Sequence, residues 1–147
     1  VFSEPKDLTS VNGSVKIFAF ADMEHYVHFY DPFVAIIENG ILRAPDAPAE
    51  FQTLLDLIRS EEQLWVREFG LGLNRAMGKH ALLNDVTAFE RQHGLHLSLG
   101  EKHGVYPKPG LPRKHTRYHV DVFIDVERIL VDGEVLFQDQ RFLPEIN

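Results

Sequence analysis

Cysteine is absent from this 147-residue chain. Without it the chain has no disulfides, no thiolate zinc sites and no cysteine nucleophile. Long apolar runs are missing too, because none approaches the roughly 20 residues needed to span a bilayer. Chemistry is therefore left to eight histidines and to carboxylates, tyrosine and serine. We expect a cytoplasmic protein with no membrane partner.

An excess of positive charge is also lacking. The chain has 15 lysines and arginines against 22 acidic residues, a net charge of −7. It lacks the general electrostatic signature of nucleic-acid binding, so no nucleic-acid partner is expected. Hydrophobic residues make up 44% and charged residues 25%, which are ordinary globular values. This composition predicts one domain, residues 1–147, with a substantial core.

Several short strands are predicted from apolar patterns. Residues 14–20 alternate after the turn residues Asn12 and Gly13. Asn-Gly at 39–40 separates two apolar runs, which is the strongest short signal of a hairpin. Asp-Gly at 132–133 is a second such signal. The expected strands or extended segments are 14–20, 33–37, 41–42, 65–72, 95–99, 118–124, 129–131 and 135–137.

Two helices are predicted. Asp46 and Pro48 open the first, and its apolar residues recur at i, i+3, i+4 and i+7. This buried stripe consists of Phe51, Leu54, Leu55 and Ile58. Residues 80–90 are predicted as a second, weaker helix. About seven short strands with two helices predict an α+β fold with one mixed, mostly antiparallel sheet.

A histidine and an aspartate share one face of the strand at 118–124. Side chains alternate along a strand, so His119 and Asp121 lie on one face, about 6.6 Å apart. A metal could bind between them. An aspartate in so apolar a strand is costly unless a metal or hydrogen bonds satisfy it. The alternative is a histidine hydrogen-bonded to an aspartate on an exposed face.

Two further residues could complete a set of nitrogen and oxygen ligands. His96 shares a strand face with Ser98, although a lone histidine there is often an ordinary core or surface residue. Glu68 begins a glycine-containing segment, and its ordinary alternative is a surface glutamate. With His119 and Asp121 the set suits zinc, cobalt, manganese or ferrous iron. Two histidines and one carboxylate would hold one metal, and more carboxylates would allow two.

Residues 101–117 are predicted to be a long loop, since they contain three prolines. They also carry five of the chain's 15 cations, in an otherwise acidic protein. Such a loop could bind an acidic peptide segment or a terminal carboxylate, or it could be solvated. The candidate peptide-binding residues are Lys108, Arg113, Lys114 and Arg117.

Six motifs in order resemble the C-terminal catalytic domain of the thermophilic-type leucyl aminopeptidases, the aminopeptidase T family. The resemblance covers nearly the whole chain, from about residue 1 to residue 137. The matching segments are Val-Asn-Gly-Ser at 11–14, Glu-Asn-Gly at 38–40, Glu-Phe-Gly-Leu-Gly-Leu-Asn at 68–74, His-Gly-Leu-His-Leu-Ser-Leu-Gly at 93–100, His-Val-Asp at 119–121 and Val-Asp-Gly-Glu at 131–134. The resemblance implies the fold of that domain, as a shortened, stand-alone version.

The resemblance also implies site residues. Glu68, His96, His119 and Asp121 match ligands of the family's two-metal peptidase site. A related dioxygenase, which acts on 2,5-dihydroxypyridine, uses only the two histidines and the aspartate, for one iron. Family peptidases carry a catalytic tyrosine seven residues beyond the first histidine. His103 stands at that position here, and Tyr106 is nearby, so these two are the catalytic candidates.

Two functions are weighed against each other. The first is a peptide-binding protein derived from a metalloaminopeptidase domain, an accessory that presents a peptide to other enzymes. The family's catalytic tyrosine is replaced here, and one of the family's glutamate ligands lies ahead of the segment that matches Val1. Both differences from the family pattern favour this function. The second is a metal-dependent enzyme, an aminopeptidase or a mononuclear iron dioxygenase. The expected partners are a peptide or a second copy of the chain, and the cofactor is one divalent metal, or none if the site is degenerate.

Overall fold

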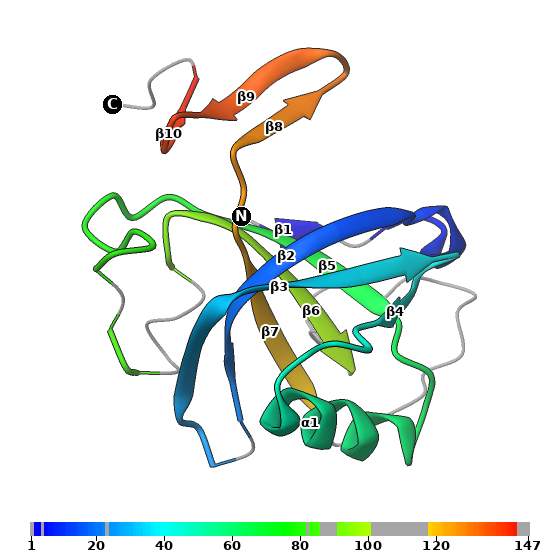
Figure 1. Ribbon diagram of the computed structural model, residues 1–147. Helices are drawn as coiled ribbons and strands as arrows, with labels where there is room; N and C mark the ends of the chain where they lie inside the picture. Colours follow the sequence, from blue (N-terminus) through cyan, green and yellow to red (C-terminus); the bar gives the residue numbers. More distant parts are fainter. Residues whose placement is uncertain are drawn as a thin grey trace.

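The computed structural model describes residues 2–3, 5–22, 24–81, 83–85, 91–100 and 118–143 (Figure 1). Within these ranges the fold is α+β, with short strands and one α-helix. The elements are β1 (Phe2–Ser3), a 3-10 turn η1 (Leu8–Ser10), β2 (Gly13–Ala21), β3 (Val27–Glu38), β4 (Ile41–Arg43), α1 (Ala49–Arg59), β5 (Val66–Gly72), β6 (Gly94–Gly100), β7 (His119–Ile124), β8 (Arg128–Val131), β9 (Glu134–Gln138) and β10 (Arg141–Phe142).

The main sheet has seven strands in the order β1-β5-β6-β7-β2-β3-β4. Each pair of neighbouring strands is antiparallel, so the expectation of a mixed sheet is corrected. The sheet curls until β4 meets the start of β5. There the Leu42 N–H donates to the Leu64 carbonyl at 2.9 Å, and the Val66 N–H donates to the Gly40 carbonyl at 2.9 Å.

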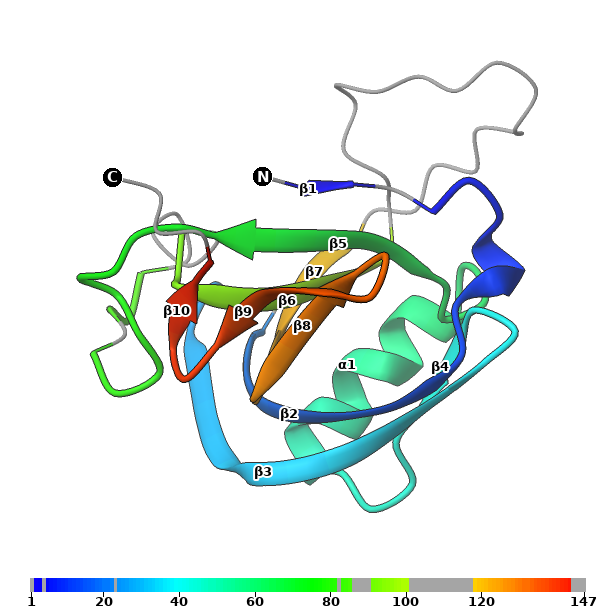
Figure 2. The same ribbon diagram turned by 90° about the horizontal axis from the view of Figure 1, so that it is seen from above.

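Helix α1 lies inside the curve of β2, β3 and β4 (Figure 2). Pro48 is its N-cap residue and Glu50 lies in its first turn, where a negative charge is favourable. The predicted stripe of Phe51, Leu54, Leu55 and Ile58 is confirmed, because these are the buried residues of the helix. They join a core with apolar side chains from one face of β6 and β7, namely Leu97, Leu99, Val120, Val122 and Ile124.

The two hairpins predicted from Asn-Gly and Asp-Gly are confirmed. Strands β3 and β4 pair around Asn39 and Gly40, whose φ angles are 48° and 80°. Strands β8 and β9 pair around Asp132 and Gly133, with φ angles of 53° and 88°. Two successive residues with positive φ match the tight hairpin turns that follow the twist of the strands.

Strand β3 begins six residues before the predicted 33–37 segment. Pro32 argues against a strand through this position in the sequence, because proline cannot donate to a sheet ladder and is confined to edges and bulges. The register shifts at this point, since Ile17 pairs with Phe33 whereas Ala19 pairs with Phe29. The proline is therefore accommodated in an irregularity of the β2–β3 ladder.

The predicted helix at 80–90 is wrong where the structure describes it. Residues 80, 81 and 83–85 have no helical conformation, and 86–90 lie outside the described residues. The side-chain oxygen of Asn84 instead accepts a hydrogen bond from the Val27 N–H at 3.1 Å, which ties this segment to the start of β3. Asparagine and aspartate at 84–85 are also poor helix formers. In the part of the chain that the structure describes, no helix has the length and hydrophobicity for a membrane crossing.

Strands β8, β9 and β10 form a second sheet, in the order β10-β9-β8. We refer to these strands as the small sheet. The expectation of one sheet is therefore corrected. The sequence does not distinguish the small sheet from the main sheet, since it contains short apolar strands for both. Its buried residues are Phe137 and Phe142, whose rings pack 4.8 Å apart between centroids.

Candidate functional site

A cluster of polar side chains lies on the outer face of β5, β6 and β7. Register places Glu68 opposite Ser98, and Ser98 opposite Asp121. Opposite residues in antiparallel strands point to the same face. His96 and His119 lie two positions away along their strands, so they share this face as well. We call Glu68, His96, Ser98, His119 and Asp121 the polar cluster.

Most of the polar cluster is buried. Glu68 and His96 are each 5% exposed, and Ser98 is completely buried. The Ser98 hydroxyl donates to Oδ1 of Asp121 at 2.5 Å, and Nε2 of His119 lies 3.4 Å from the same oxygen. Buried polar groups of this kind are costly unless they are hydrogen-bonded. These contacts meet the expectation that Asp121 needs partners in so apolar a strand.

The His96 imidazole lies over the backbone of β5, where Gly70 is its register partner. A β-carbon built on Gly70 would come within 1.9 Å of Nε2 of His96. Only glycine leaves room for the ring at this point. On the other side the ring packs on Phe123, with 5.4 Å between ring centroids. This glycine therefore positions His96 within the cluster.

The Asp121 carboxyl has a perturbed pKa. Burial alone would raise it. The hydrogen bond with His119, the positive charges of His96 and His119, and the Ser98 hydrogen bond together lower it by more. The pKa therefore lies below the ordinary value of 3.8.

Replacing Asp121 by asparagine should remove stability at neutral pH. The folded carboxyl binds its proton less tightly than the unfolded one, so its contribution is present above pH 3.8 and is lost as pH falls through that value towards the folded pKa. The difference in unfolding free energy between wild type and Asp121→Asn should be largest near pH 7 and shrink below about pH 4. Urea denaturation of chelator-treated protein across this range measures it. An equal difference at every pH for Asp121→Asn would contradict the prediction.

The sequence-predicted site residues divide into two groups. The structure brings Glu68, His96, His119 and Asp121 to neighbouring positions on one face. Among the described residues, however, no three histidine, aspartate or glutamate side chains are placed so that they could hold a metal ion. Their role as ligands stays a prediction. The other candidates lie outside the described residues, namely His103, Tyr106, Lys108, Arg113, Lys114 and Arg117.

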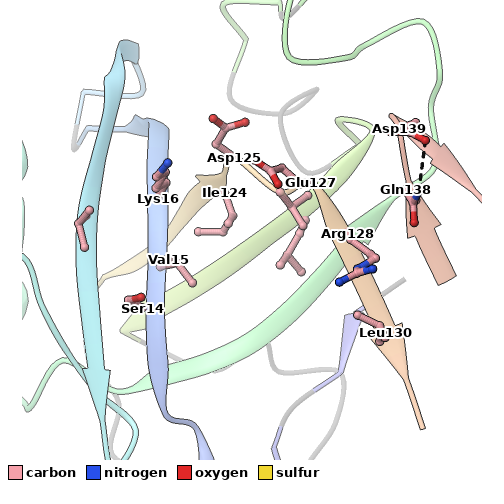
Figure 3. Close-up of a pocket in the computed structure, with 13 residues that line it drawn as sticks. Ser14, Val15, Lys16, Ile124, Asp125, Glu127, Arg128, Leu130, Gln138 and Asp139 are labelled. Atoms are coloured by element: carbon pink, nitrogen blue, oxygen red, sulfur yellow. Dashed lines mark hydrogen bonds between the residues drawn. The ribbon is translucent and has the colours of Figure 1, made fainter. Parts of the chain in front are cut away.

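A groove of about 800 Å³ lies between β2 and the small sheet, and the sequence did not indicate it. We call it the edge groove. Figure 3 shows Ser14 and Lys16 on β2 across the groove from Arg128 and Leu130 on β8. Its lining residues are Ser14, Val15, Lys16, Val34, Leu95, Ile124, Asp125, Val126, Glu127, Arg128, Leu130, Gln138 and Asp139.

Two strand edges border the edge groove. Strand β7 pairs with β2 only from Ile17 to Phe20, and one more hydrogen bond follows, from the Asp125 N–H to the Lys16 carbonyl at 2.8 Å. Beyond it the backbone of Ser14 faces the same side as that of Lys16, because backbone direction alternates along a strand. Strand β8 is the outer strand of the small sheet. Both walls thus present strand edges with few ladder partners.

Comparison of the chain with protein-family models, curated proteins and solved structures finds no match. The function is therefore inferred from the polar cluster and the edge groove.

Proposed function

We propose that this protein binds a peptide in extended conformation in the edge groove, as an accessory that presents the peptide to other enzymes. The observation that supports this function is a groove bordered by two strand edges. A peptide in such a place can add to a sheet through main-chain hydrogen bonds, while alternate side chains enter the groove. This mode needs no catalytic residue.

The lining of the edge groove suits a peptide that carries both apolar and charged side chains. Val34 and Leu130 are 48% and 50% exposed, so a peptide would cover apolar surface that now faces water. Asp125 is paired with Lys79 at 2.6 Å. Within the described residues neither Lys16 nor Arg128 forms an ion pair, so both are placed to meet a peptide carboxylate.

The cations at Lys108, Arg113, Lys114 and Arg117 are proposed to select an acidic end of the peptide. They lie outside the described residues, so their part rests on the sequence alone. Glu127 and Asp139 line the groove as well, so the groove carries both signs of charge.

A charge placed in the edge groove should weaken peptide binding. Leu130→Asp puts a carboxylate on a half-exposed position that lines the groove, so the fold should tolerate it. Peptides about ten residues long, enough for one strand, would be selected from a phage-displayed random library on the wild type. Titration calorimetry should show at least about a tenfold loss of affinity in the variant.

The matched control is Val131→Asp. Val131 is 51% exposed and adjacent on β8, but it does not line the groove. This variant should bind as the wild type does. A library that yields no binding peptide, or equal losses in the two variants, would exclude the groove as the binding site.

The second candidate is a metal-dependent enzyme, an aminopeptidase or a mononuclear iron dioxygenase, that uses Glu68, His96, His119 and Asp121. Burial of Glu68 and His96 on the face that also carries His119 and Asp121 favours it. Metal content after mild purification separates the two functions. Peptide binding that a chelator leaves unchanged supports the accessory protein. Stoichiometric zinc or iron together with release of amino acids from peptides supports the enzyme.

A further inference from the structure

The small sheet forms one wall of the edge groove, and His93, just before β6, packs against it. His93 is 5% exposed. Its ring lies 5.5 Å from the ring of Phe137 on β9 and 5.1 Å from that of Phe142 on β10, measured between centroids. Both phenylalanines are buried. The imidazole is therefore part of an apolar contact between the small sheet and the residues just before β6.

The His93 ring has an unsatisfied nitrogen in this contact. Nε2 is buried and has no hydrogen-bond partner among the described residues. The backbone is held in place, since the His93 N–H donates to the Met77 carbonyl at 2.8 Å. A neutral imidazole tolerates such a site at modest cost. An imidazolium does not, because a buried charge without a partner is strongly unfavourable.

The charges around His93 do not favour its protonation. Among the described residues the charge that acts on the ring is that of Arg75, a cation in the segment before β6. The small sheet presents aromatic rings to it. The charged residues of the small sheet and its turns are all exposed, namely Arg128, Asp132, Glu134, Asp139 and Arg141. Burial and, to a lesser extent, Arg75 lower the pKa of His93 below its ordinary 6.5.

We propose that His93 is an acid-sensitive latch: its protonation releases the small sheet from the main sheet and so removes one wall of the edge groove. The role of the latch in ligand release rests on the proposed function, because it regulates the same groove. The release itself depends only on the contact of His93 with Phe137 and Phe142. Peptide would then be held at neutral pH and released in acid.

The direction of the pH effect follows from linkage. In the docked state the small sheet packs on His93, and in the released state the imidazole is solvated. The docked state binds the His93 proton less tightly than the released state. Docking is therefore strongest above pH 6.5 and weakens as pH falls through 6.5 towards the lower pKa of the docked state. Between the two values the docking equilibrium changes by up to about tenfold per pH unit.

Amide hydrogen exchange of the peptide-free protein at about pH 8 and about pH 5 tests the latch, with rates corrected for the intrinsic pH dependence of exchange. Protection of the amides in β8, β9 and β10 should fall by up to about tenfold per pH unit, while α1 stays protected. In His93→Phe, which keeps an aromatic ring that cannot titrate, the protection should not change with pH. The control His80→Phe, at an exposed histidine, should behave as the wild type.

Protection that falls equally in α1 and in the small sheet would overturn the latch, since it indicates global unfolding. If His93→Phe does not fold, NMR titration of the wild-type imidazole decides, and a His93 pKa at or above 6.5 overturns the proposal. If protection falls in acid but the protein binds no library peptide, the latch is supported and the proposed function is excluded. If the protein binds a peptide but protection does not change with pH, the proposed function is supported and the latch is excluded.

Discussion

Leu54→Ala is expected to lower the free energy of unfolding by about 2–5 kcal/mol. Leu54 is 2% exposed and lies in the middle of the α1 stripe, within the core that the curled sheet encloses. Truncation removes buried methyl groups and leaves a cavity that the curled sheet cannot easily close. Chemical denaturation monitored by circular dichroism measures the loss.

The control on the same helix is Leu57→Ala. Leu57 is 37% exposed, so its truncation should cost well under half as much as that of Leu54. Similar values for the two variants, or a loss of less than about 1 kcal/mol for Leu54→Ala, would show that the stripe does not form the core contact.

Gly70→Ala is expected to displace the His96 ring and to cost about 1–3 kcal/mol or more. The added methyl group would lie 1.9 Å from Nε2 and 2.0 Å from Cε1 of the imidazole. His96 is 5% exposed and packs on Phe123, so the ring cannot move aside without disturbing its neighbours. The His96 side-chain NMR signals should shift, and the unfolding midpoint in urea should fall.

Gly78→Ala is the matched control for this variant. A β-carbon at Gly78 meets no atom within 4 Å, so neither stability nor the His96 signals should change appreciably. If Gly70→Ala leaves the His96 signals in place, then Gly70 does not position the ring.

The Gly70→Ala variant also separates the two candidate functions. The edge groove includes Leu95 and Ile124, which point to the face of β6 and β7 opposite His96 and Asp121. Moving the His96 ring should therefore leave peptide binding in the groove nearly intact. In a metal-dependent enzyme it would instead weaken metal binding, because a proposed ligand has moved.

Local features of this protein follow from the sequence alone. The Asn39-Gly40 and Asp132-Gly133 turns adopt positive φ because these residue types tolerate it, whatever lies elsewhere in the chain. The spacing of Phe51 and Leu54 predicts which side of α1 is buried. Strand parity likewise predicts that His119 and Asp121 share a face. Each of these inferences uses residues only a few positions apart.

Only the tertiary structure decides which strands are neighbours and which edges stay open. Glu68 and Ser98 are brought opposite each other by the β5–β6 pairing, although 30 positions separate them in the chain. Alternation predicts the face of each residue but not the partner strand or its register, which depend on how the whole sheet curls around α1. The edge groove has the same origin, because β2 runs past the end of its pairing with β7 while β8 joins a separate sheet. No local sequence pattern predicts where one strand extends beyond the end of its pairing with another. The proposed binding site could therefore be found only in the folded chain.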